Sequence, residues 1–437
     1  MTDIDPAEMR RLTEAIKQGD CVAFVGAGFS GAANLPGWRE LLQELAGSAA
    51  LDADTARHVE TRIRIGSGDS LDEAAQILED GLGRRTLLEL LRERLADPPE
   101  SASMAERTRL LAGIPFQAVL TTNFDGVMRG GTPTGSGYRD ILRQQQLGPW
   151  DELFWGLDDS AAAPVMKLHG DLLGSDLESS IVLTRRDYRR RLYSDVAYQT
   201  FLRSVMATTT VLYMGFSFQD AYLNELRSEV LALFGHQPGD APVAYAIAND
   251  VPDVTQRHFT QHEGIRILSF DSKDGTDFSG FDGILRSIHD ETNPVHRFAR
   301  HLQARRILWM DPHPENNTVA FKFLSAAAAY AETPEPSLTK VHNVTEALDA
   351  LAQGNFDAIL THWGQADPAT ESAAEQLMIG LRRADYRVPT IVFAARTADI
   401  DARRQAVLGL GGVAYCFRFK AVLQELDRLF GSAAEHG

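Results

Sequence analysis

Short apolar runs alternate with segments of helical periodicity along the whole of this 437-residue chain. Before residue 290 the apolar runs are CVAFVG (21–26), AVLTTN (118–123), VMKLHG (165–170), TVLYMGFS (210–217), VAYAIA (243–248) and IRILSF (265–270). Strands that alternate with helices predict βαβ units, in which parallel strands form a sheet and the helices cross over its faces. The chain is therefore predicted to have an α/β fold built on a parallel sheet.

A long helical stretch separates the first two apolar runs. Residues 37–112 carry apolar side chains at helical spacing, as in LDEAAQILEDGL (71–82) and TLLELLRERL (86–95). We therefore expect an inserted helical subdomain between the first two strands.

A second set of apolar runs follows residue 300. These runs are RRILWMDP (305–312), FDAILTHW (356–363), VPTIVFAA (388–395) and GVAYCFRF (412–419), and helical segments separate them. They predict a smaller doubly wound, flavodoxin-like or receiver-like α/β domain. The amphipathic segment 292–306 predicts a helical connector. We therefore expect a first domain over 1–295 and a second over 303–437.

The charge of the chain limits its partners. A formal net charge of −17 at pH 7 argues against non-specific attraction to nucleic acid or to anionic lipid. Arg185, Arg186, Arg189, Arg190 and Arg191 form a local basic patch, which is best interpreted as a solvated helix face. No apolar stretch reaches the ~18 residues that a membrane-spanning helix needs, and the first residues lack the layout of a signal peptide. We expect a cytoplasmic protein that contacts no membrane.

The two cysteines, Cys21 and Cys416, lie far apart in the sequence, each within an apolar run. This placement allows neither a disulfide framework nor a cysteine-based zinc site. We expect two buried thiols and no bound metal.

A glycine-rich turn follows the first apolar run. Gly26-Ala27-Gly28-Phe29-Ser30 stands directly after the run and before the helix that is expected to begin at Trp38. Glycines at a turn from strand to helix let the backbone approach a pyrophosphate, whose charge is complemented by exposed amides. A tight turn without a ligand would explain the same pattern, so this motif alone does not establish a dinucleotide site.

Three further polar turns follow later runs, at TTNFD (121–125), KLHGD (167–171) and GFSFQD (215–220). Taken singly, Asn123 and Asp220 could be helix caps, and a lone histidine is most often structural. Because the carboxyl ends of parallel strands meet at one edge of a sheet, however, all of these turns are expected to converge on one crevice. That crevice is where a Rossmann-like sheet binds a dinucleotide.

The motifs GAGFS, TTNFD, KLHG and GFSFQD, in this order and at these separations, resemble the sirtuin-like NAD-hydrolase domains of bacterial antiphage defence proteins. The resemblance covers about residues 20–270 and implies that NAD+ is the substrate. It implies that Asn123 and His169 are the catalytic residues, needed to break the nicotinamide–ribose bond. It also implies a cofactor-binding role for Gly26, Ala27, Gly28, Phe29, Ser30, Trp38, Thr122, Asp125, Gly215 and Ser217, with Ser217 near the adenosine end.

The chain departs from the protein deacetylases of the sirtuin family. It lacks their paired CxxC zinc module, and Leu35-Pro36-Gly37-Trp38 stands where their GIP-D-F-R type of segment lies. We therefore predict an NAD+ glycohydrolase that yields nicotinamide and ADP-ribose, in which Asn123 orients a water and His169 handles protons. Two alternatives remain open: a non-catalytic NAD or ADP-ribose sensor, and a protein deacylase or ADP-ribosyltransferase.

The resemblance carries a biological expectation as well. It implies an abortive-infection effector in antiphage defence that works as a homo-oligomer and is switched on by a phage-derived or partner-protein trigger. The sequence does not distinguish a linear from a cyclised ADP-ribose product.

The second domain resembles response-regulator receivers in its order of strands and helices. A working receiver has an acidic pair after its first strand, a phosphoacceptor aspartate after the third, a hydroxyl after the fourth and a lysine after the fifth. Here these places hold a single Asp311, Thr361-His362, Ala394-Ala395 and Phe417-Arg418. We expect a degenerate receiver-like or Toll/interleukin-receptor-like domain without phosphotransfer.

Such a domain could bind a partner protein, a nucleotide signal or another copy of the chain, or it could serve only to stabilise oligomers. A polar cluster of His313, Glu315, Asn316 and Asn317 follows its first strand. This cluster is open to two interpretations, a ligand site and the cap of the next helix.

Overall fold

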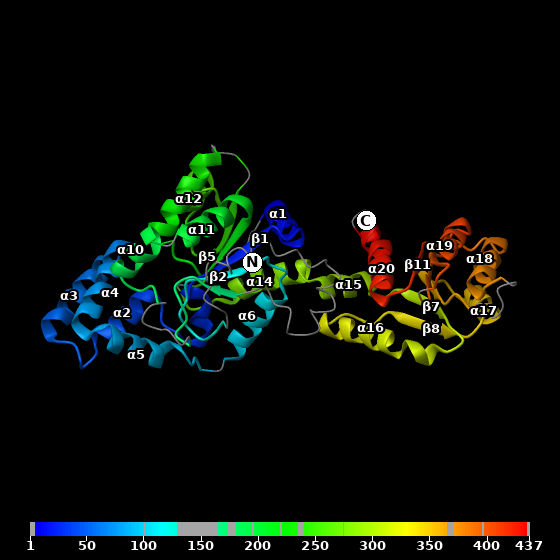
Figure 1. Ribbon diagram of the computed structural model, residues 1–437, viewed down its shortest axis with the longest axis horizontal. Coiled ribbons are helices and arrows are strands. Elements are labelled where there is room, and N and C mark those ends of the chain that lie inside the picture. The colour runs from blue at the N-terminus through cyan, green and yellow to red at the C-terminus, as the bar shows by residue number, and fades with distance from the viewer. Residues whose placement is uncertain are drawn as a thin grey trace. The chain divides into compact units, whose positions relative to one another are not determined.

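The structure is a computed structural model, and it describes residues 5–99, 101–128, 165–173, 181–194, 196–218, 221–234, 240, 242–273, 275–364, 371–395 and 397–434. The chain divides into two compact units, with the boundary between Thr292 and Asn293 (Figure 1). Each unit has its own parallel sheet and its own hydrophobic core.

The first unit contains a six-stranded sheet in which all neighbouring strands are parallel. The strands are β1 (Cys21–Val25), β2 (Val119–Thr121), β3 (Val165–Lys167), β4 (Thr210–Met214), β5 (Ala244–Asn249) and β6 (Ile265–Phe270). Their order is β3-β2-β1-β4-β5-β6, which is that of a Rossmann sheet. The predicted fold class is confirmed. The strand order reverses between β1 and β4, where such sheets bind ligands.

Helices cover both faces of this sheet, because its central strands are apolar on both sides. In β1, Cys21, Ala23 and Val25 join the core on one face, and Val22 and Phe24 join the core on the other. The first face is packed by α1 (Pro6–Lys17), α6 (Ala102–Gly113) and α14 (Ser279–Thr292), and the second by α11 (Val196–Thr208), α12 (Ala221–Phe234) and α13 (Asp253–His262).

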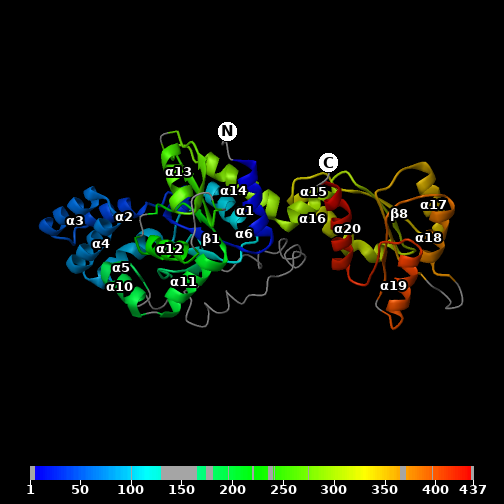
Figure 2. The same ribbon diagram turned by 90° about the horizontal axis from the view of Figure 1, so that it is seen from above.

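The predicted helical insertion lies between β1 and β2. It consists of the 3-10 helix η1 (Ala27–Ala33), then α2 (Trp38–Ala46), α3 (Ala53–Ile65), α4 (Gly68–Leu82) and α5 (Arg84–Leu95), before α6 returns to the sheet. Figure 2 shows α2 to α5 grouped with α10 (Arg185–Ser194) at one end of the unit. Leu71, Leu78 and Leu91 of the insertion belong to the same core cluster as Val25 of β1. The insertion therefore extends the core of the sheet and has no separate core of its own.

The second unit contains a five-stranded parallel sheet. Its strands are β7 (Arg306–Met310), β8 (Ser337–Val341), β9 (Ala358–Thr361), β10 (Thr390–Phe393) and β11 (Ala414–Cys416), in the order β11-β10-β9-β7-β8. This is the 2-1-3-4-5 order of flavodoxin-like and receiver domains. The predicted doubly wound fold is confirmed.

Helices cover both faces of the second sheet as well. One face carries α15 (Pro294–Leu302), α16 (Thr318–Tyr330) and α20 (Phe419–Ala434), and the other carries α17 (Val344–Gln353), α18 (Ala373–Arg383) and α19 (Ile400–Gly409). A short 3-10 helix, η3 (Pro314–Asn317), precedes α16. The expected helix in the segment 292–306 is present as α15.

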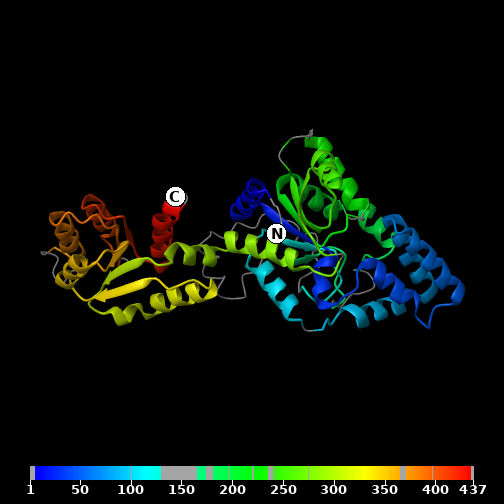
Figure 3. The same cartoon turned by 180° about the vertical axis from the view of Figure 1, so that it is seen from behind.

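The sequence did not predict β8, whose residues SLTKV do not form an apolar run. This strand lies at the edge of the second sheet, beside β7 (Figure 3). Its side chains are mostly exposed or half-buried, and only Val341 is fully buried. An edge strand needs less apolar surface than a central one, so its sequence carries a weaker signal.

Two expectations about side chains can be compared with the structure. Cys21 and Cys416 are both buried free thiols, as predicted. The interpretation of the arginine patch as a solvated face agrees with the exposure of Arg186, Arg189 and Arg190, while Arg185 is half-buried. Arg185 and Arg186 also pair with acidic side chains of α4. No described helix is long and apolar enough to cross a membrane.

Candidate functional site

The carboxyl ends of β1 to β5 border a cavity of about 530 Å³, a size typical of small-molecule sites. Its lining includes the predicted catalytic residues Asn123 and His169. It also includes most of the predicted cofactor-binding residues: Gly26, Ala27, Gly28, Ser30, Trp38, Thr122, Asp125, Gly215 and Ser217. Four motifs that are far apart in the sequence thus meet at one crevice. Gln219 and Asp220 of the GFSFQD motif lie outside the described residues.

Phe29 is the one predicted cofactor-binding residue that does not line the cavity. Its side chain is fully buried in the core, with its ring 6.1 Å from that of Phe281 between centroids and the Arg107 guanidinium above it. A 3-10 helix turns by a third of a circle at each residue. Phe29 therefore faces the core, while Gly28 and Ser30 on either side of it border the cavity.

Two glycine turns touch at the point where the strand order reverses. The Gly26 amide donates to the Met214 carbonyl, and the Gly28 amide donates to the Gly215 carbonyl, both at 2.9 Å. Gly215 has a φ of +61°, and a Cβ added there would lie 2.1 Å from the Phe29 nitrogen. Only glycine fits this position, and the close contact of the two turns leaves their backbone at the cavity wall.

Asn123 is held by hydrogen bonds to the backbone of β1 and its turn. The Thr121 hydroxyl donates to the Val25 carbonyl at 2.8 Å and accepts from the Asn123 amide at 3.0 Å. The Asn123 Nδ2 donates to the Gly26 carbonyl at 3.1 Å and to the Ser30 hydroxyl at 3.2 Å. These bonds fix the side chain at the edge of the cavity and occupy its donor group.

A buried acid and a buried lysine lie behind Asn123. Burial raises the pKa of the Asp125 carboxyl above its ordinary value, although hydrogen bonds from Ser30 and from the Val127 amide and the charge of Lys167 oppose the shift. The Lys167 Nζ donates to the Asp125 carbonyl at 2.6 Å and to the Asp171 carboxylate at 2.9 Å. Lys167 is fully buried in β3, so this cation ties the ends of β2 and β3 together.

His169 lies just beyond the carboxyl end of β3 and is 5% exposed. Its ring lies near two aromatic rings. The Phe124 centroid is 6.4 Å away, and the Tyr188 centroid is 5.2 Å away with its plane at 81° to the imidazole. The His169 carbonyl accepts from the Val182 amide at 2.9 Å.

Several cavity residues were not predicted. Asn249 ends β5 and lines the cavity, and its position after an apolar run is a signal that could have identified it. Tyr188 and Asp72 also line the cavity, but they come from helices α10 and α4. Helical residues of this kind have no local pattern that points to a strand-end site. Among the described residues, no cluster of His, Cys, Asp and Glu is placed to hold a metal ion.

Comparison with known proteins agrees with this arrangement. Residues 117–268, which include Asn123, His169 and Gly215, match the family model described as SIR2-like domain. The expected resemblance to sirtuin-like domains is confirmed. The glycine turn of β1 precedes the matched residues and faces them across the cavity.

Curated relatives of the chain are named as NAD(+) hydrolases. The chain is 28% identical over 228 residues to NAD(+) hydrolase ThsA of Enterococcus faecium, a match that covers 51% of this chain and 42% of the relative. It is 25% identical over 264 residues to NAD(+) hydrolase ThsA of Cytobacillus dafuensis, covering 60% of this chain and 48% of the relative. The chain thus spans less than half the length of the curated relatives it matches.

Solved structures similar to part of the chain include a receiver domain and a response regulator. One is from a Francisella response regulator, with 17% identity and a TM-score of 0.24, covering 30% of this chain and 98% of that one. Another is a two-component response regulator from Clostridium difficile, with 16% identity, a TM-score of 0.25 and the same coverage. The fold of the second unit is established by its own strand order.

The second sheet also has a cavity at the carboxyl ends of its strands, with a volume of about 650 Å³. Asp311, Asn317 and His362 line it together with the apolar side chains Phe393 and Phe417. The Asp311 carboxylate accepts from the His313 amide at 2.8 Å and from the Asn317 Nδ2 at 2.9 Å. Asn317 stands at the N-cap position of α16, but its side chain does not cap that helix.

Proposed function

We propose that the first unit hydrolyses NAD+ to nicotinamide and ADP-ribose. The observation that carries this proposal is that Asn123 and His169 line one cavity with the glycine turns that follow β1 and β4. Backbone amides at a glycine turn suit the pyrophosphate of a dinucleotide. The relatives named NAD(+) hydrolase ThsA support the same substrate.

The proposed reaction is a substitution at the ribose carbon that carries nicotinamide. The bond to the nicotinamide nitrogen breaks, the electron pair leaves with neutral nicotinamide, and an oxocarbenium-like ribose remains. Water attacks that carbon and loses a proton, so that NAD+ and water give nicotinamide, ADP-ribose and H+. Because its Nδ2 already donates to Gly26 and Ser30, Asn123 offers its Oδ1 as the acceptor that orients the water. His169 takes the proton.

Chromatography of nicotinamide and of residual NAD+ tests the proposal. The wild-type chain is expected to release one nicotinamide for each NAD+ consumed. Asn123→Ala is expected to lose about 100-fold or more in turnover. It should still bind NAD+, since the glycine turns remain intact.

The same experiment separates the rival activities. NAD+ binding without loss of NAD+, at any protein concentration, would refute hydrolysis and favour a sensor. Nicotinamide release only in the presence of an acylated peptide or an acceptor protein would favour a deacylase or an ADP-ribosyltransferase. Mass spectrometry of the product distinguishes ADP-ribose from a cyclised form, which is lighter by one water.

We further propose a biological setting for this activity. The chain acts in the cytoplasm, where the NAD+ pool lies, as an abortive-infection effector against phage. Residues 1–295 carry the chemistry, and residues 303–437 regulate it by binding a trigger or a second copy of the chain. This proposal rests on the resemblance to antiphage proteins. Plating of phage on cells that express the wild type or Asn123→Ala tests it, since only the wild type is expected to reduce plaque formation and deplete NAD+.

A further inference from the structure

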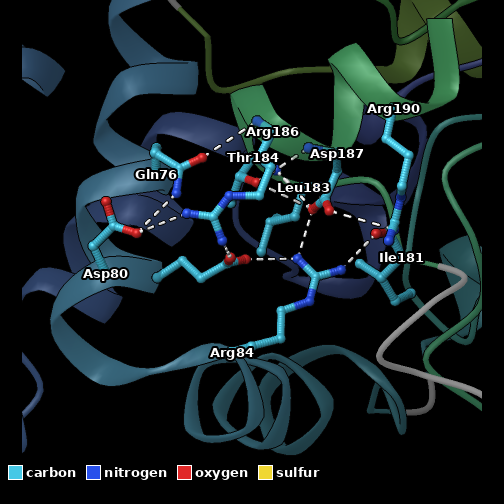
Figure 4. Close-up of polar contacts among 10 residues, drawn as sticks. Gln76, Asp80, Arg84, Ile181, Leu183, Thr184, Arg186, Asp187 and Arg190 are labelled. Carbon is cyan, nitrogen blue, oxygen red and sulfur yellow. Dashed lines mark hydrogen bonds and ion pairs between the residues drawn. The ribbon is translucent and has the colours of Figure 1, made fainter. Parts of the chain in front are cut away.

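Arg84 links three segments of the first unit, although it lies outside the lining of the cavity. Its Nη1 donates to the carboxylates of Glu79 and Asp187, each at 2.6 Å, and its Nη2 donates to the Ile181 carbonyl at 2.7 Å (Figure 4). The side chains of Glu79 and Asp187 are only 6% and 7% exposed. A single guanidinium thus joins α4, α5 and the segment that leads into α10.

These contacts stabilise the charge of Arg84 at a half-buried position. Burial alone would lower the pKa of Arg84, but hydrogen bonds to Glu79 and Asp187 raise it above its ordinary value. Without Arg84, Glu79 and Asp187 would keep only the largely exposed side chains of Arg186 and Arg190 as cationic partners. Loss of the most buried cation from such a network costs more than the loss of a surface pair. The segment around Asp187 is therefore tied to Arg84 strongly enough to fix its position.

Asp187 in turn holds the start of α10 through hydrogen bonds. The same carboxylate oxygen that meets Arg84 accepts from the Leu183 amide at 3.1 Å and from the Thr184 amide at 3.2 Å. The Thr184 hydroxyl accepts from the Asp187 amide at 3.4 Å, so that the two residues form a reciprocal cap at the first turn. Arg84 thereby sets the direction in which α10 begins.

Residues 181–188, which include two of the partners of Arg84, line the cavity next to His169. Val182, Leu183 and Tyr188 line the cavity, and the Val182 amide donates to the His169 carbonyl. Tyr188 presents its ring to the imidazole at 81°, an edge-to-face arrangement that favours one ring orientation. The position of α10 thus sets where the Tyr188 ring meets the imidazole.

Helix α4 is joined to the start of α10 by further ion pairs. Arg185 pairs with Glu73 at 2.8 Å. Arg186 pairs with Glu79 at 3.1 Å and with Asp80 at 3.2 Å (Figure 4). The first turns of α4 line the cavity themselves, through Gly68, Leu71 and Asp72. These ion pairs therefore join two cavity-lining helices, α4 and α10, and Arg84 provides the most buried link between them.

We propose that Arg84 is a positioning residue for His169: by holding Ile181 and Asp187 it sets the Tyr188 ring against the imidazole. Its effect on turnover rests on the proposed NAD+ hydrolysis, whereas its effect on the ring can be measured without turnover. Loss of Arg84 lets the segment 181–188 move, and His169 then samples other orientations. The proton-transfer step should slow more than NAD+ binding weakens.

A comparison of Arg84→Met with Arg85→Met in the full chain tests the proposal. Arg85 is the adjacent arginine, and it pairs with Glu89 on the surface, where the two side chains are 83% and 64% exposed. The first readout is the NMR signal of the His169 ring in histidine-labelled protein, assigned by its absence in His169→Ala. The second readout is the pair of constants kcat and KM for NAD+.

We expect Arg84→Met to move the His169 ring signal in the direction seen in Tyr188→Leu. Its kcat should fall about 10-fold or more while its KM changes less than about threefold, the pattern of a residue that acts on the transition state. Arg85→Met should match the wild type in both readouts. Tyr188→Phe, which keeps the ring, should restore most of the kcat that Tyr188→Leu loses.

The other outcomes either overturn the proposal or change which readout or variant decides it. An unmoved His169 signal in Arg84→Met overturns it, whatever the activity. A moved signal with unchanged kcat overturns the positioning role. If the wild type binds NAD+ but does not cleave it, the proposed function fails, and the NMR signal alone decides whether Arg84 positions the ring. If Arg84→Met does not fold, Asp187→Asn, which weakens the same pair but keeps the cap, takes its place with the same expected result.

Discussion

The two sheets of this protein share an architecture and differ in what their strand ends carry. Both are parallel and both have a cavity at the carboxyl edge, of about 530 Å³ in the first unit and about 650 Å³ in the second. In the first unit, glycine turns, an asparagine and a histidine meet at the cavity, and helix α4 lines one side of it. In the second, the single Asp311 is bound to Asn317, and alanines follow β10. The fold provides a place for a site, and the turn residues decide its chemistry.

Two glycines with a positive φ, one in each unit, differ in how closely other atoms approach them. In the first unit the turns after β1 and β4 touch backbone to backbone, with Gly28 and Gly215 in contact. In the second unit Gly411 also has a positive φ, of +90°, but the nearest atom to an added Cβ is 3.8 Å away, at the end of the Arg382 side chain. Gly215 is therefore needed for a close backbone contact, whereas Gly411 is needed only for a left-handed turn.

The largest expected contrast is between two strand-end histidines. His169→Ala should lower NAD+ turnover by about 100-fold to 10,000-fold, the usual contribution of a general acid or base. His362→Ala, at the end of β9, should leave turnover within about twofold, because this residue lies in the other unit. Nicotinamide release measures both variants. Equal losses would show that the second cavity takes part in the reaction.

The next contrast concerns the two glycines. Gly215→Ala should destabilise the first unit by about 3–5 kcal/mol, because the new Cβ would lie 2.1 Å from the Phe29 nitrogen at a φ of +61°. Gly411→Ala should cost only about 1–2 kcal/mol, the price of a left-handed conformation without a clash. Urea unfolding followed by circular dichroism compares them. A Gly215 variant as stable as the Gly411 variant would contradict the close contact of the turns.

A third contrast lies in the pH dependence of two carboxyls. Burial raises the pKa of Asp125 in the folded protein. The contribution of Asp125 to stability is therefore fully present below 3.8, its pKa in the unfolded chain, and is lost as the pH rises through its higher pKa in the folded state. The backbone amide and the side chain of His342 lower the pKa of Glu346, so its contribution is present above the unfolded value of 4.5 and is lost as pH falls through the folded pKa.

Substitution should reveal these opposite slopes. Relative to wild type, Asp125→Asn should gain stability as pH rises from 4 to 7, whereas the deficit of Glu346→Gln should disappear as pH falls below about 4.5. Thermal unfolding over this pH range measures both variants. Parallel curves for Asp125→Asn and wild type would show that Asp125 ionises as freely as an exposed acid.

The smallest contrast is between the two thiols, which belong to the cores of different units. Burial raises the pKa of Cys416 to about 12 and that of Cys21 well above its ordinary value. Since the thiolate is the reactive form, both should react with Ellman's reagent at pH 8 much more slowly in the native protein than in urea. Cys21, with no exposed surface, should be the slower of the two. A fast native reaction would indicate that one core opens readily.

Much of the fold could be predicted from the sequence. The apolar runs predicted every strand of the first sheet, because central strands covered on both faces need continuous apolar segments. The same rule explains why β8 was missed, since an edge strand with exposed side chains carries no such run. The helical insertion was predicted from its periodicity, but periodicity could not show that its leucines share a core with β1.

The sequence by itself determined which residues follow each strand. Parallel strands end at one edge, so Asn123, His169 and Gly215 had to lie near one another once the sheet formed. Only the tertiary structure decided that Phe29 faces the core, that Tyr188 reaches His169 and that Arg84 holds the segment between them. Local periodicity depends on neighbours in the chain, whereas these contacts depend on how separate segments pack. Arg84 and Asp187 are 103 residues apart, and no local pattern records that they meet.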